Sequence, residues 1–211
     1  MKLDTGLVHI VDDDDAMRDS LVFLLSAASL DARAYASAED FLDTLSSAET
    51  GCIVTDARMP GMSGLELLRH LRAIDNTLPV VVMTGHSDVP MAVSALKAGA
   101  HDFIEKPFDD ERMIEVVRSA LVYRDEARRR QQDRETALAR IGALTERERQ
   151  VFDGLVAGQP NKIIAHELGI SARTVEIYRA NVMSKLGASS LSDVVRTAFV
   201  GEGMPDRRTP V

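Results

Sequence analysis

Side chains that could bind a metal ion and a phosphoryl group follow several short apolar runs in the first half of the chain. They are Asp12, Asp13, Asp56, Thr84 and Lys106. Carboxylates gathered in one place repel one another, and a divalent cation relieves that repulsion. Oxygen ligands that leave coordination positions open to water or phosphate suit Mg²⁺. If the fold brings these residues together, they predict a magnesium-dependent phosphoryl-transfer site.

Each residue type would have its own task in such a site. Asp56, kept ionised beside the metal, can attack a phosphoryl group as a carboxylate nucleophile. Lys106 can bring a positive charge to the phosphoryl oxygens, and Thr84 can donate a hydroxyl hydrogen bond. Asp14 and Asp15 are explained more simply as the acidic start of a helix. The set therefore predicts Asp56 as the phosphoacceptor.

The pattern of residues 1–122 predicts the sheet that would bring these groups together. Short apolar runs alternate with stretches of helical periodicity, and five such βα repeats with short connections predict a doubly wound parallel α/β sheet. The expected strands are Leu7–Val11, Ala32–Tyr35, Cys52–Thr55, Val80–Met83 and His101–Ile104. In a parallel sheet the carboxyl ends share one edge, where ligand crevices form. The strand order 2-1-3-4-5 makes the first and third strands neighbours, which places Asp12, Asp13 and Asp56 together.

Three of the intervening stretches carry residues at helical spacing. The first has Leu21, Leu24, Leu25 and Ala28, the second has Leu65, Leu68 and Leu71, and the third has Val93, Leu96 and Lys97. A recurrence every three or four positions places each set on one face of a helix. The sequence therefore predicts a helix in each of these stretches.

Composition and charge favour two domains with different partners. The chain has 211 residues and a formal net charge of -8, and residues 1–123 hold 21 acidic and 10 basic residues. Residues 144–211 hold 8 acidic and 9 basic residues, which alone would not indicate DNA binding. No long apolar run and no secretory signal is visible, so we expect a cytoplasmic protein without membrane attachment. The single cysteine, Cys52, allows no intramolecular disulfide and is typical of a small core residue.

Residues 123–143 form a polar stretch of good helix formers with mixed charge and no proline. Such a composition predicts a semi-rigid helical linker that extends the last helix of the first domain. The basic run Arg128–Arg130 could bind nucleic acid, but a solvated helix face explains it more simply. Residues 201–211 are expected to form a disordered tail.

Residues 144–200 carry start and stop signals for helices and no strand pattern. Thr145 and Glu148 form a capping box for the first helix. The second is expected over Asn161–Leu168. The third should run from an N-cap at Ser171 to Leu186, with Gly187 as its C-cap. The last is expected over Ser190–Val200, which completes an all-α domain of four helices.

The third of these helices has two faces of different character. Val175, Tyr178, Val182 and Leu186 form an inward stripe, whereas Arg173, Glu176, Ile177, Ala180 and Ser184 lie on the other face. An outward Ile177 suits a helix in a DNA major groove, where it can touch a thymine methyl group. Glu176 could accept from a cytosine amine, and basic side chains could reach phosphates. The predicted DNA contacts are Lys162, Arg173, Thr174, Glu176, Ile177, Arg179, Ala180 and Lys185; from the pattern alone, any small four-helix bundle remains an alternative.

The acidic site lies in motifs that resemble the receiver domain of two-component response regulators. The motifs are VDDDD after the first strand, VTDARMPGMSG around Asp56, MTG at Thr84 and FIEKPF at Lys106, and the resemblance covers residues 7–122. It implies phosphorylation of Asp56 and a Mg²⁺ ion held by Asp13, Asp56 and the backbone carbonyl of Arg58. Asp12 would bind the ion mostly through water.

The resemblance also implies a switch pair made of Thr84 and Phe103. In the phosphorylated state Thr84 would turn toward the phosphoryl group, and Phe103 would pack inward behind it. A phenylalanine at a strand position is explained equally well as ordinary core, so both explanations stay open. The family also has a cis bond at the position of Lys106–Pro107, which an X-Pro bond permits.

The segment LTERERQVFDGLVAGQPNKIIAHELGISARTVEIYRANVMSKLGA resembles the LuxR-type helix-turn-helix of the NarL/FixJ regulators over residues 144–200. The stretches PNKIIA, ISARTVE, RANVM and TGHSDVPMAV are most similar to the FixJ-type nitrogen-fixation regulators. Tyr178 departs from the family, which commonly has His there. Because Tyr178 lies on the inward stripe, we expect it to alter packing more than DNA contacts.

Together the two resemblances imply a transcription regulator controlled by phosphorylation. A sensor histidine kinase would phosphorylate Asp56, and a homodimer would form through residues 88–97, 101–104 and 109–118. The dimer would set two recognition helices on half-sites of promoter DNA. Activation of transcription is expected, with RNA polymerase as a further partner.

Other classes of protein fit the sequence less well. A magnesium-dependent phosphatase or phosphotransferase of the haloacid-dehalogenase type also forms an aspartyl phosphate, but it needs an acid two residues after the nucleophile, where this chain has Arg58. A nucleotide-binding Rossmann protein is disfavoured because no G-x-G-x-x-G follows the first strand. A receiver with a protein- or RNA-binding output domain stays possible. We expect a protein that is not an enzyme.

Overall fold

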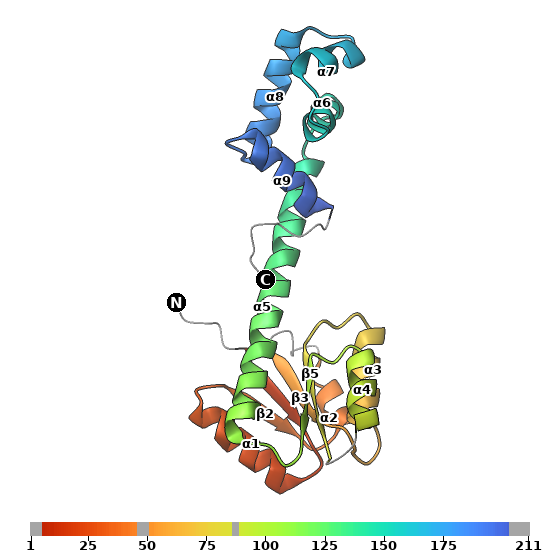
Figure 1. The fold of residues 1–211 in the computed structure, drawn as a ribbon, viewed down its shortest axis with the longest axis vertical. Helices are drawn as coiled ribbons and strands as arrows, with labels where there is room; N and C mark the ends of the chain where they lie inside the picture. The colour runs from red at the N-terminus through yellow and green to blue at the C-terminus, as the bar shows by residue number, and fades with distance from the viewer. Residues whose placement is uncertain (1–5, 46–50, 86–88, 203–211) are drawn as a thin grey trace. The chain divides into compact units, whose positions relative to one another are not determined.

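The computed structural model describes residues 6–45, 51–85 and 89–202 (Figure 1). It divides into two compact units, Met1–Ala127 and Arg128–Val211. In the part of the chain that is described, no helix is long and apolar enough to cross a membrane.

The described residues of the first unit form one parallel sheet of five strands in the order β2-β1-β3-β4-β5. The strands are β1 Val8–Val11, β2 Ala32–Tyr35, β3 Cys52–Asp56, β4 Val80–Thr84 and β5 Asp102–Glu105. The connecting helices are α1 Asp15–Ala27, α2 Ala38–Leu42, α3 Gly64–Ala73, α4 Val89–Lys97 and the long α5 Asp110–Gly142. The predicted α/β fold and strand order are confirmed, with strand ends that differ by one residue.

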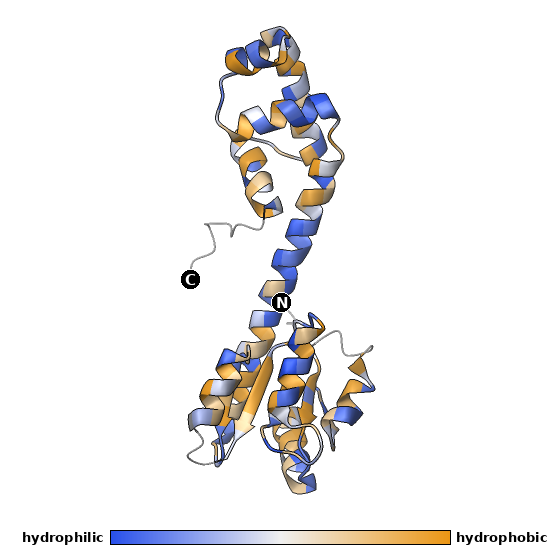
Figure 2. Ribbon diagram, turned by 90° about the vertical axis from the view of Figure 1, so that its right-hand side faces the viewer, coloured by the Kyte–Doolittle hydropathy of each residue, from blue (hydrophilic) through white to orange (hydrophobic). Residues whose placement is uncertain are grey.

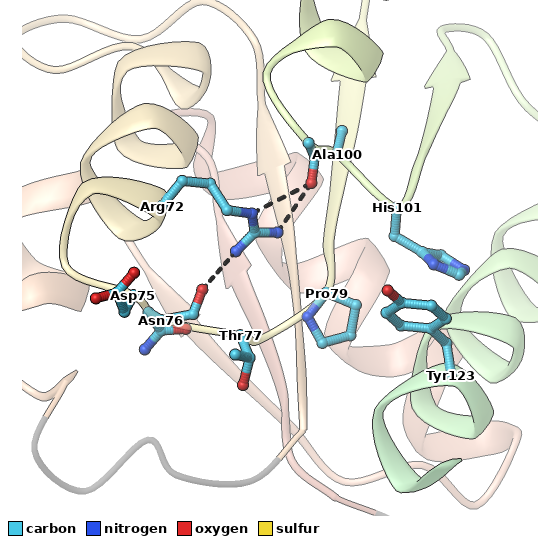
Figure 3. A pocket seen from close by; sticks show the side chains of 9 residues that line it. Arg72, Asp75, Asn76, Thr77, Pro79, Ala100, His101 and Tyr123 are labelled. Atoms are coloured by element: carbon cyan, nitrogen blue, oxygen red, sulfur yellow. Dashed lines mark hydrogen bonds between the residues drawn. The ribbon is translucent and has the colours of Figure 1, made fainter. Parts of the chain in front are cut away.

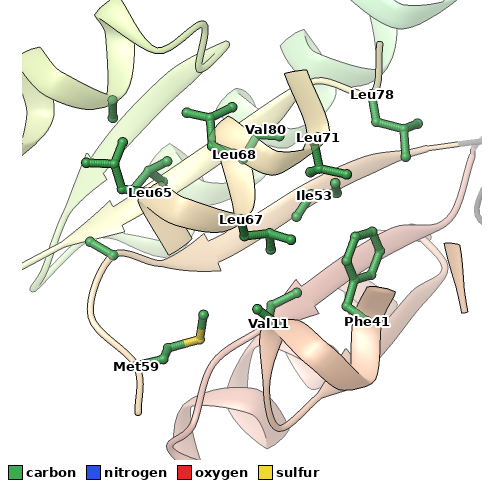
Figure 4. Packing of buried hydrophobic residues seen from close by; sticks show 14 of the residues in the cluster. Val11, Phe41, Ile53, Met59, Leu65, Leu67, Leu68, Leu71, Leu78 and Val80 are labelled. Atoms are coloured by element: carbon green, nitrogen blue, oxygen red, sulfur yellow. The ribbon is translucent and has the colours of Figure 1, made fainter. Parts of the chain in front are cut away.

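The sheet is buried on both faces, as its continuous apolar strands require. On one face Phe41 of α2 and the α3 leucines Leu67, Leu68 and Leu71 pack against Val11 and other strand residues (Figure 4). On the other face Leu21 and Leu25 of α1 and Val116 and Val117 of α5 pack together. Cys52 is fully buried in this second cluster, as expected, and burial raises the pKa of its thiol to about 12 although the charge of Arg124 opposes the shift.

Helix α4 follows the predicted spacing, but two of its larger apolar side chains face solvent. Val93 is 43% exposed and Leu96 is 46% exposed, whereas the small residues Ala92 and Ala95 are buried. A periodic pattern locates a helix without deciding which of two apolar faces is covered. The outward apolar face of α4 is therefore a finding of the structure.

The second unit contains the end of α5 and the helices α6 Glu146–Val156, α7 Asn161–Leu168, α8 Ala172–Leu186 and α9 Leu191–Gly201. The predicted capping box of Thr145 and Glu148 is present, and Ser171 caps α8 by accepting from Thr174 N. Gly187 ends α8 with φ 65°, a left-handed conformation that favours glycine.

The stretch predicted as a linker lies in α5 as far as Gly142. Its middle is hydrophilic (Figure 2), and Arg128, Arg129 and Arg130 are exposed. The tail prediction placed its first residue too early, because Gly201 is the last residue of α9. Residues 203–211 lie outside the described residues.

Candidate functional site

Lys106 joins the carboxylates of Asp12 and Asp56 at the carboxyl edge of the sheet. Its Nζ donates to Asp12 Oδ2 at 3.0 Å and to Asp56 Oδ1 at 2.5 Å. The side chain of Asp12 is 2% exposed, that of Asp56 is 14% exposed and that of Lys106 is 24% exposed. Residues that are far apart in the sequence therefore form one charged cluster, and Asp56 within it stays within reach of solvent.

The surroundings of Lys106 favour its charged form. Partial burial by itself would lower the pKa of the ammonium, but the hydrogen bonds and charges of Asp56 and Asp12 outweigh it. The pKa of Lys106 is therefore raised above its ordinary value. A permanent cation beside the Asp56 carboxylate can stabilise negative charge that arrives on a phosphoryl group.

The connection from β3 to α3 holds Asp56 in place. Its carboxylate oxygen Oδ2 accepts from the backbone N–H of Arg58 at 2.5 Å. Helix α3 begins directly behind it, so close that a Cβ on Gly64 would lie 2.0 Å from the backbone oxygen of Asp56. Only glycine permits this approach, and Ser63 then caps α3 in a capping box with Glu66.

The connection from β1 to α1 positions Asp12. Asp12 Oδ1 accepts from the backbone N–H of Asp14 at 2.9 Å, and Arg18 Nη1 donates to the backbone oxygen of Asp12 at 2.7 Å. Asp14 caps α1 by accepting from Ala16 N, which confirms its expected place at a helix start. The side chain of Asp13 is exposed. The contact of Arg18 was not foreseen, because no motif marks a side chain that binds a backbone oxygen.

Thr84 and Phe103 lie on neighbouring strands. Thr84 ends β4 and is buried, and its backbone oxygen accepts from the N–H of Lys106 at 2.7 Å. Phe103 in β5 is half-buried and lines a cavity of about 340 Å³ together with Pro107 and Phe108. Phe103 is therefore not an ordinary core residue in this structure. The Lys106–Pro107 peptide bond is cis.

The carboxylates at the sheet edge suit Mg²⁺ in a site completed by water. Among the residues that the structure describes, no three Asp, Glu, His or Cys side chains lie close enough together to hold a metal ion. Asp12 and Asp56 do lie together, through Lys106. Because Mg²⁺ often takes one or two carboxylates and keeps several waters, this pair of carboxylates fits the ion.

The two faces of α8 are those that the pattern predicts. Val175, Val182 and Leu186 are buried, and Tyr178 is half-buried against them. On the other face Arg173, Glu176 and Ala180 are exposed, Ile177 is 57% exposed, and Arg179 is half-buried. Thr174 bonds to Ser171 at the helix start, and Lys162 on α7 is exposed. An apolar side chain thus stands outward among polar neighbours on an exposed helix.

Lys185 differs from the other predicted DNA contacts. Its Nζ donates to Glu148 Oε2 at 2.6 Å and to the backbone oxygen of Ala143 at 3.2 Å. Its ammonium is therefore directed at neighbouring parts of its own domain. The residue pattern places Lys185 on the edge of the outward face and carries no signal for this pair, which joins residues 37 positions apart.

A cavity of about 570 Å³ lies at the amino ends of β4 and β5 (Figure 3). Asp56 lies at the other, carboxyl edge of the sheet. Arg72 holds its wall together by donating to the backbone oxygens of Asn76, Leu78 and Gly99. His101 and Tyr123 form another wall, with ring centroids 5.1 Å apart, and burial lowers the pKa of His101. No motif in the sequence indicated this cavity.

Residues 8–118 match the response regulator receiver domain, and residues 142–198 match the luxR family of bacterial regulatory proteins. FixJ from Azorhizobium caulinodans is 52% identical over 204 residues, which cover 96% of this chain and 97% of that protein. The chain belongs to the FixJ-type response regulators. FixJ from Rhizobium meliloti is 50% identical over 194 residues, which cover 92% of this chain and 95% of that protein.

Solved structures agree with this membership in the FixJ-type regulators. Response regulator StyR has a TM-score of 0.80 at 38% identity, covering 91% of this chain and 97% of that one. Full-length FixJ from B. japonicum has a TM-score of 0.60 at 46% identity, and the match covers 95% of this chain and 98% of that one. The protein is thus a two-component response regulator that controls transcription through a LuxR-type DNA-binding domain. The family is not enzymatic, so the haloacid-dehalogenase alternative is excluded.

Proposed function

We propose that Asp56 of this FixJ-type regulator accepts a phosphoryl group from the phosphohistidine of a sensor histidine kinase. The pair of hydrogen bonds from Lys106 Nζ to Asp56 and Asp12 carries the proposal. In the transfer a carboxylate oxygen of Asp56 bonds to phosphorus while the phosphorus–nitrogen bond of the donor breaks. Lys106 stays charged at neutral pH and neutralises part of the charge on the phosphoryl oxygens.

Mg²⁺ is the proposed metal. Asp56 and the backbone carbonyl of Arg58 hold it, Asp12 binds it mostly through water, and Asp13 joins them when its exposed side chain turns toward the ion. Receiver domains generally bind Mg²⁺ for phosphorylation. When bound, the ion supplies positive charge to the phosphoryl oxygens and reduces repulsion among the carboxylates. Asp12 is already oriented for this role by Asp14 N and Lys106.

Thr84 and Phe103 are the proposed switch residues. The backbone oxygen of Thr84 accepts from Lys106 N, so both residues lie at the edge of the sheet where Lys106 meets Asp56. A hydrogen bond from the Thr84 hydroxyl to the phosphoryl group draws its side chain toward Asp56. Phe103 then moves inward from the cavity that it lines with Phe108.

Phosphorylation in this proposal favours a homodimer through α4, β5 and the start of α5. The exposed Val93 and Leu96 of α4 supply apolar area on this face, and Arg112 of α5 pairs with Asp102 of β5 at 3.1 Å. A two-fold axis would place the same patch on both subunits. Asp88, the first residue of the predicted face, lies outside the described residues.

The dimer binds promoter DNA through α8 of each subunit and activates transcription with RNA polymerase. Ile177, Glu176, Thr174 and Ala180 face the base edges, and Arg173, Arg179 and Lys162 reach phosphates. Two linked recognition helices gain affinity over one because the second binding event is intramolecular. The 57% exposure of Ile177 on a helix with basic flanks supports this docking.

The phosphoacceptor is tested by incubating the full chain with acetyl phosphate and Mg²⁺ and locating the phosphate by mass spectrometry. We expect one phosphoryl group on Asp56, none on Asp56→Asn and none after removal of Mg²⁺ by a chelator. Asp75→Asn is the matched control, because Asp75 is exposed and lies at the other end of the sheet. Wild-type labelling of Asp56→Asn would refute the assignment.

A further inference from the structure

The C-terminal end of α8 is held by charged side chains from neighbouring elements of its own unit. The last four carbonyls of a helix lack partners within the helix and carry its negative dipole end. At this end Arg140 of α5 donates from Nη1 to the backbone oxygen of Leu186 at 2.9 Å. The same guanidinium lies 3.5 Å from the point where a Cβ of Gly187 would stand. Arg140 therefore covers the end of the helix with a positive charge.

Lys185 ties the same end of α8 to the start of α6. Its partner Glu148 is 4% exposed and also accepts from the backbone N–H of Thr145 at 2.8 Å. The hydrogen bond from Lys185, followed by the one from Thr145, holds the pKa of Glu148 below its ordinary value. Lys185 thus completes a capping box that would otherwise leave a buried carboxylate without a cation.

Apolar packing joins the end of α5 to the same place. Ile141 of α5 is buried in a cluster with Phe152 of α6 and with Val182 and Leu186 of α8. A Cβ on Gly201, the last residue of α9, would lie 3.2 Å from Ile141 Cδ1. The luxR match begins at residue 142, so these contacts come from residues just before it.

We propose that Lys185 and Arg140 are positioning residues that fix the recognition helix from its C-terminal end, and that the last turns of α5 are a structural part of the DNA-binding domain. Lys185 then acts on DNA through Glu148 and not by binding a phosphate. The inference rests on the proposed docking of α8, because a positioning role has an effect on DNA only if α8 binds it.

The two possible roles of Lys185 predict opposite effects of changing Glu148. If Lys185 bound a phosphate, Glu148→Gln would release the ammonium and remove a negative charge, so DNA binding would stay equal or become tighter. If Lys185 positions α8 through Glu148, the same substitution weakens binding. Because the effects of substitutions in contacting residues are not additive, the double variant with Lys185→Gln and Glu148→Gln should bind DNA no more weakly than either single variant.

The experiment measures binding of the phosphorylated full chain to its promoter duplex over a range of salt concentrations. We expect Lys185→Gln and Glu148→Gln each to weaken binding about tenfold, or about 1.4 kcal/mol, with the wild-type salt dependence. Lys185→Arg should restore affinity. Glu146→Gln is the matched control, because Glu146 is exposed at the start of α6, the helix that also holds Glu148, and it should leave the affinity for DNA unchanged. Circular dichroism checks that each variant is folded.

Other outcomes overturn the inference in distinguishable ways. A drop of about one in the salt slope for Lys185→Gln, together with unchanged or tighter binding by Glu148→Gln, makes Lys185 a phosphate contact. Arg173→Gln reports on the docking itself, because an exposed phosphate contact should lower the slope by about one. If Arg173→Gln leaves both affinity and slope unchanged, the docking of α8 is wrong and the positioning role fails with it.

Discussion

Removing the ammonium of Lys106 should destabilise the receiver unit in the absence of Mg²⁺. Lys106→Met keeps most of the aliphatic side chain and removes the charge that Asp12 and Asp56 share at 3.0 and 2.5 Å. The Asp12 side chain is 2% exposed, so water cannot replace the lost partner fully. What remains is a buried carboxylate beside a second carboxylate of the same sign.

The magnitude follows from two opposing contributions. A charge pair at this separation near a protein surface attracts by roughly 5 to 7 kcal/mol. The cost of taking the ammonium out of water on folding offsets much of that attraction. Breaking a fully buried pair costs about 3 to 5 kcal/mol, and Lys106 is 24% exposed. We therefore expect Lys106→Met to lower the free energy of unfolding by about 2 to 3 kcal/mol.

The effect is measured by urea unfolding of the full chain in the presence of a chelator, with circular dichroism as the signal. The transition of the receiver unit is the one that shifts when Mg²⁺ is added. Lys97→Met is the matched control, because Lys97 is exposed on α4, and it should change the stability by less than about 0.5 kcal/mol. In an Asp12→Asn background the loss caused by Lys106→Met should be smaller, because one carboxylate no longer needs a cation. Equal stabilities of Lys106→Met and Lys97→Met would refute the reasoning.

Further predictions concern pH, the end of α5 and the dimer. Because the pKa of Lys106 is raised in the folded state, its contribution to stability is complete below the ordinary value of 10.5 and is lost as pH rises through the folded value, so wild type and Lys106→Met should converge in urea titrations at high pH. Ile141→Ala should destabilise the helical unit by about 2 to 4 kcal/mol in thermal or urea unfolding, whereas Leu138→Ala, at 48% exposure, should change little. Val93→Asp should abolish the phosphorylation-dependent dimer in sedimentation velocity without changing phosphate incorporation; a wild-type dimer would exclude this face. Ile177→Ala should weaken specific DNA binding by about 1 to 2 kcal/mol, at about 0.8 kcal/mol for each buried CH₂ group, with an unchanged salt slope. An equal loss on nonspecific DNA would contradict a base contact.

Much of the fold could be predicted because its signals are local. Strands β2 and β3 begin at the predicted residues, and Thr145, Ser171 and Gly187 cap helices where expected. A cap depends on hydrogen bonds within about four residues, and burial of a parallel strand appears as a continuous apolar run. Such features are visible in a window of a few residues.

Several features of the candidate sites could not be predicted because they depend on distant parts of the chain. The covered face of α4 is set by which side approaches the sheet, so Ala92 is buried and Leu96 is exposed. The cavity around Arg72 arises where two connections meet, and its hydrogen bonds to Gly99 span 27 positions. Side-chain periodicity carries no information on contacts between segments that are distant in the sequence.

The order of residues by itself predicts the parallel sheet and places Asp56 and a lysine at its edge, and the resemblance of the motifs adds the two-domain response regulator and the prediction that Asp56 is the phosphoacceptor. The placement at the edge follows from residue types repeated at the ends of strands, which any parallel sheet must bring to one edge. The tertiary structure alone decides that Lys106 bridges Asp12 across 94 positions and that Lys185 turns to Glu148 instead of solvent. The physical reason is that the partner of a long, flexible lysine side chain depends on which acidic groups lie within its reach and how buried they are. Only the folded backbone determines both.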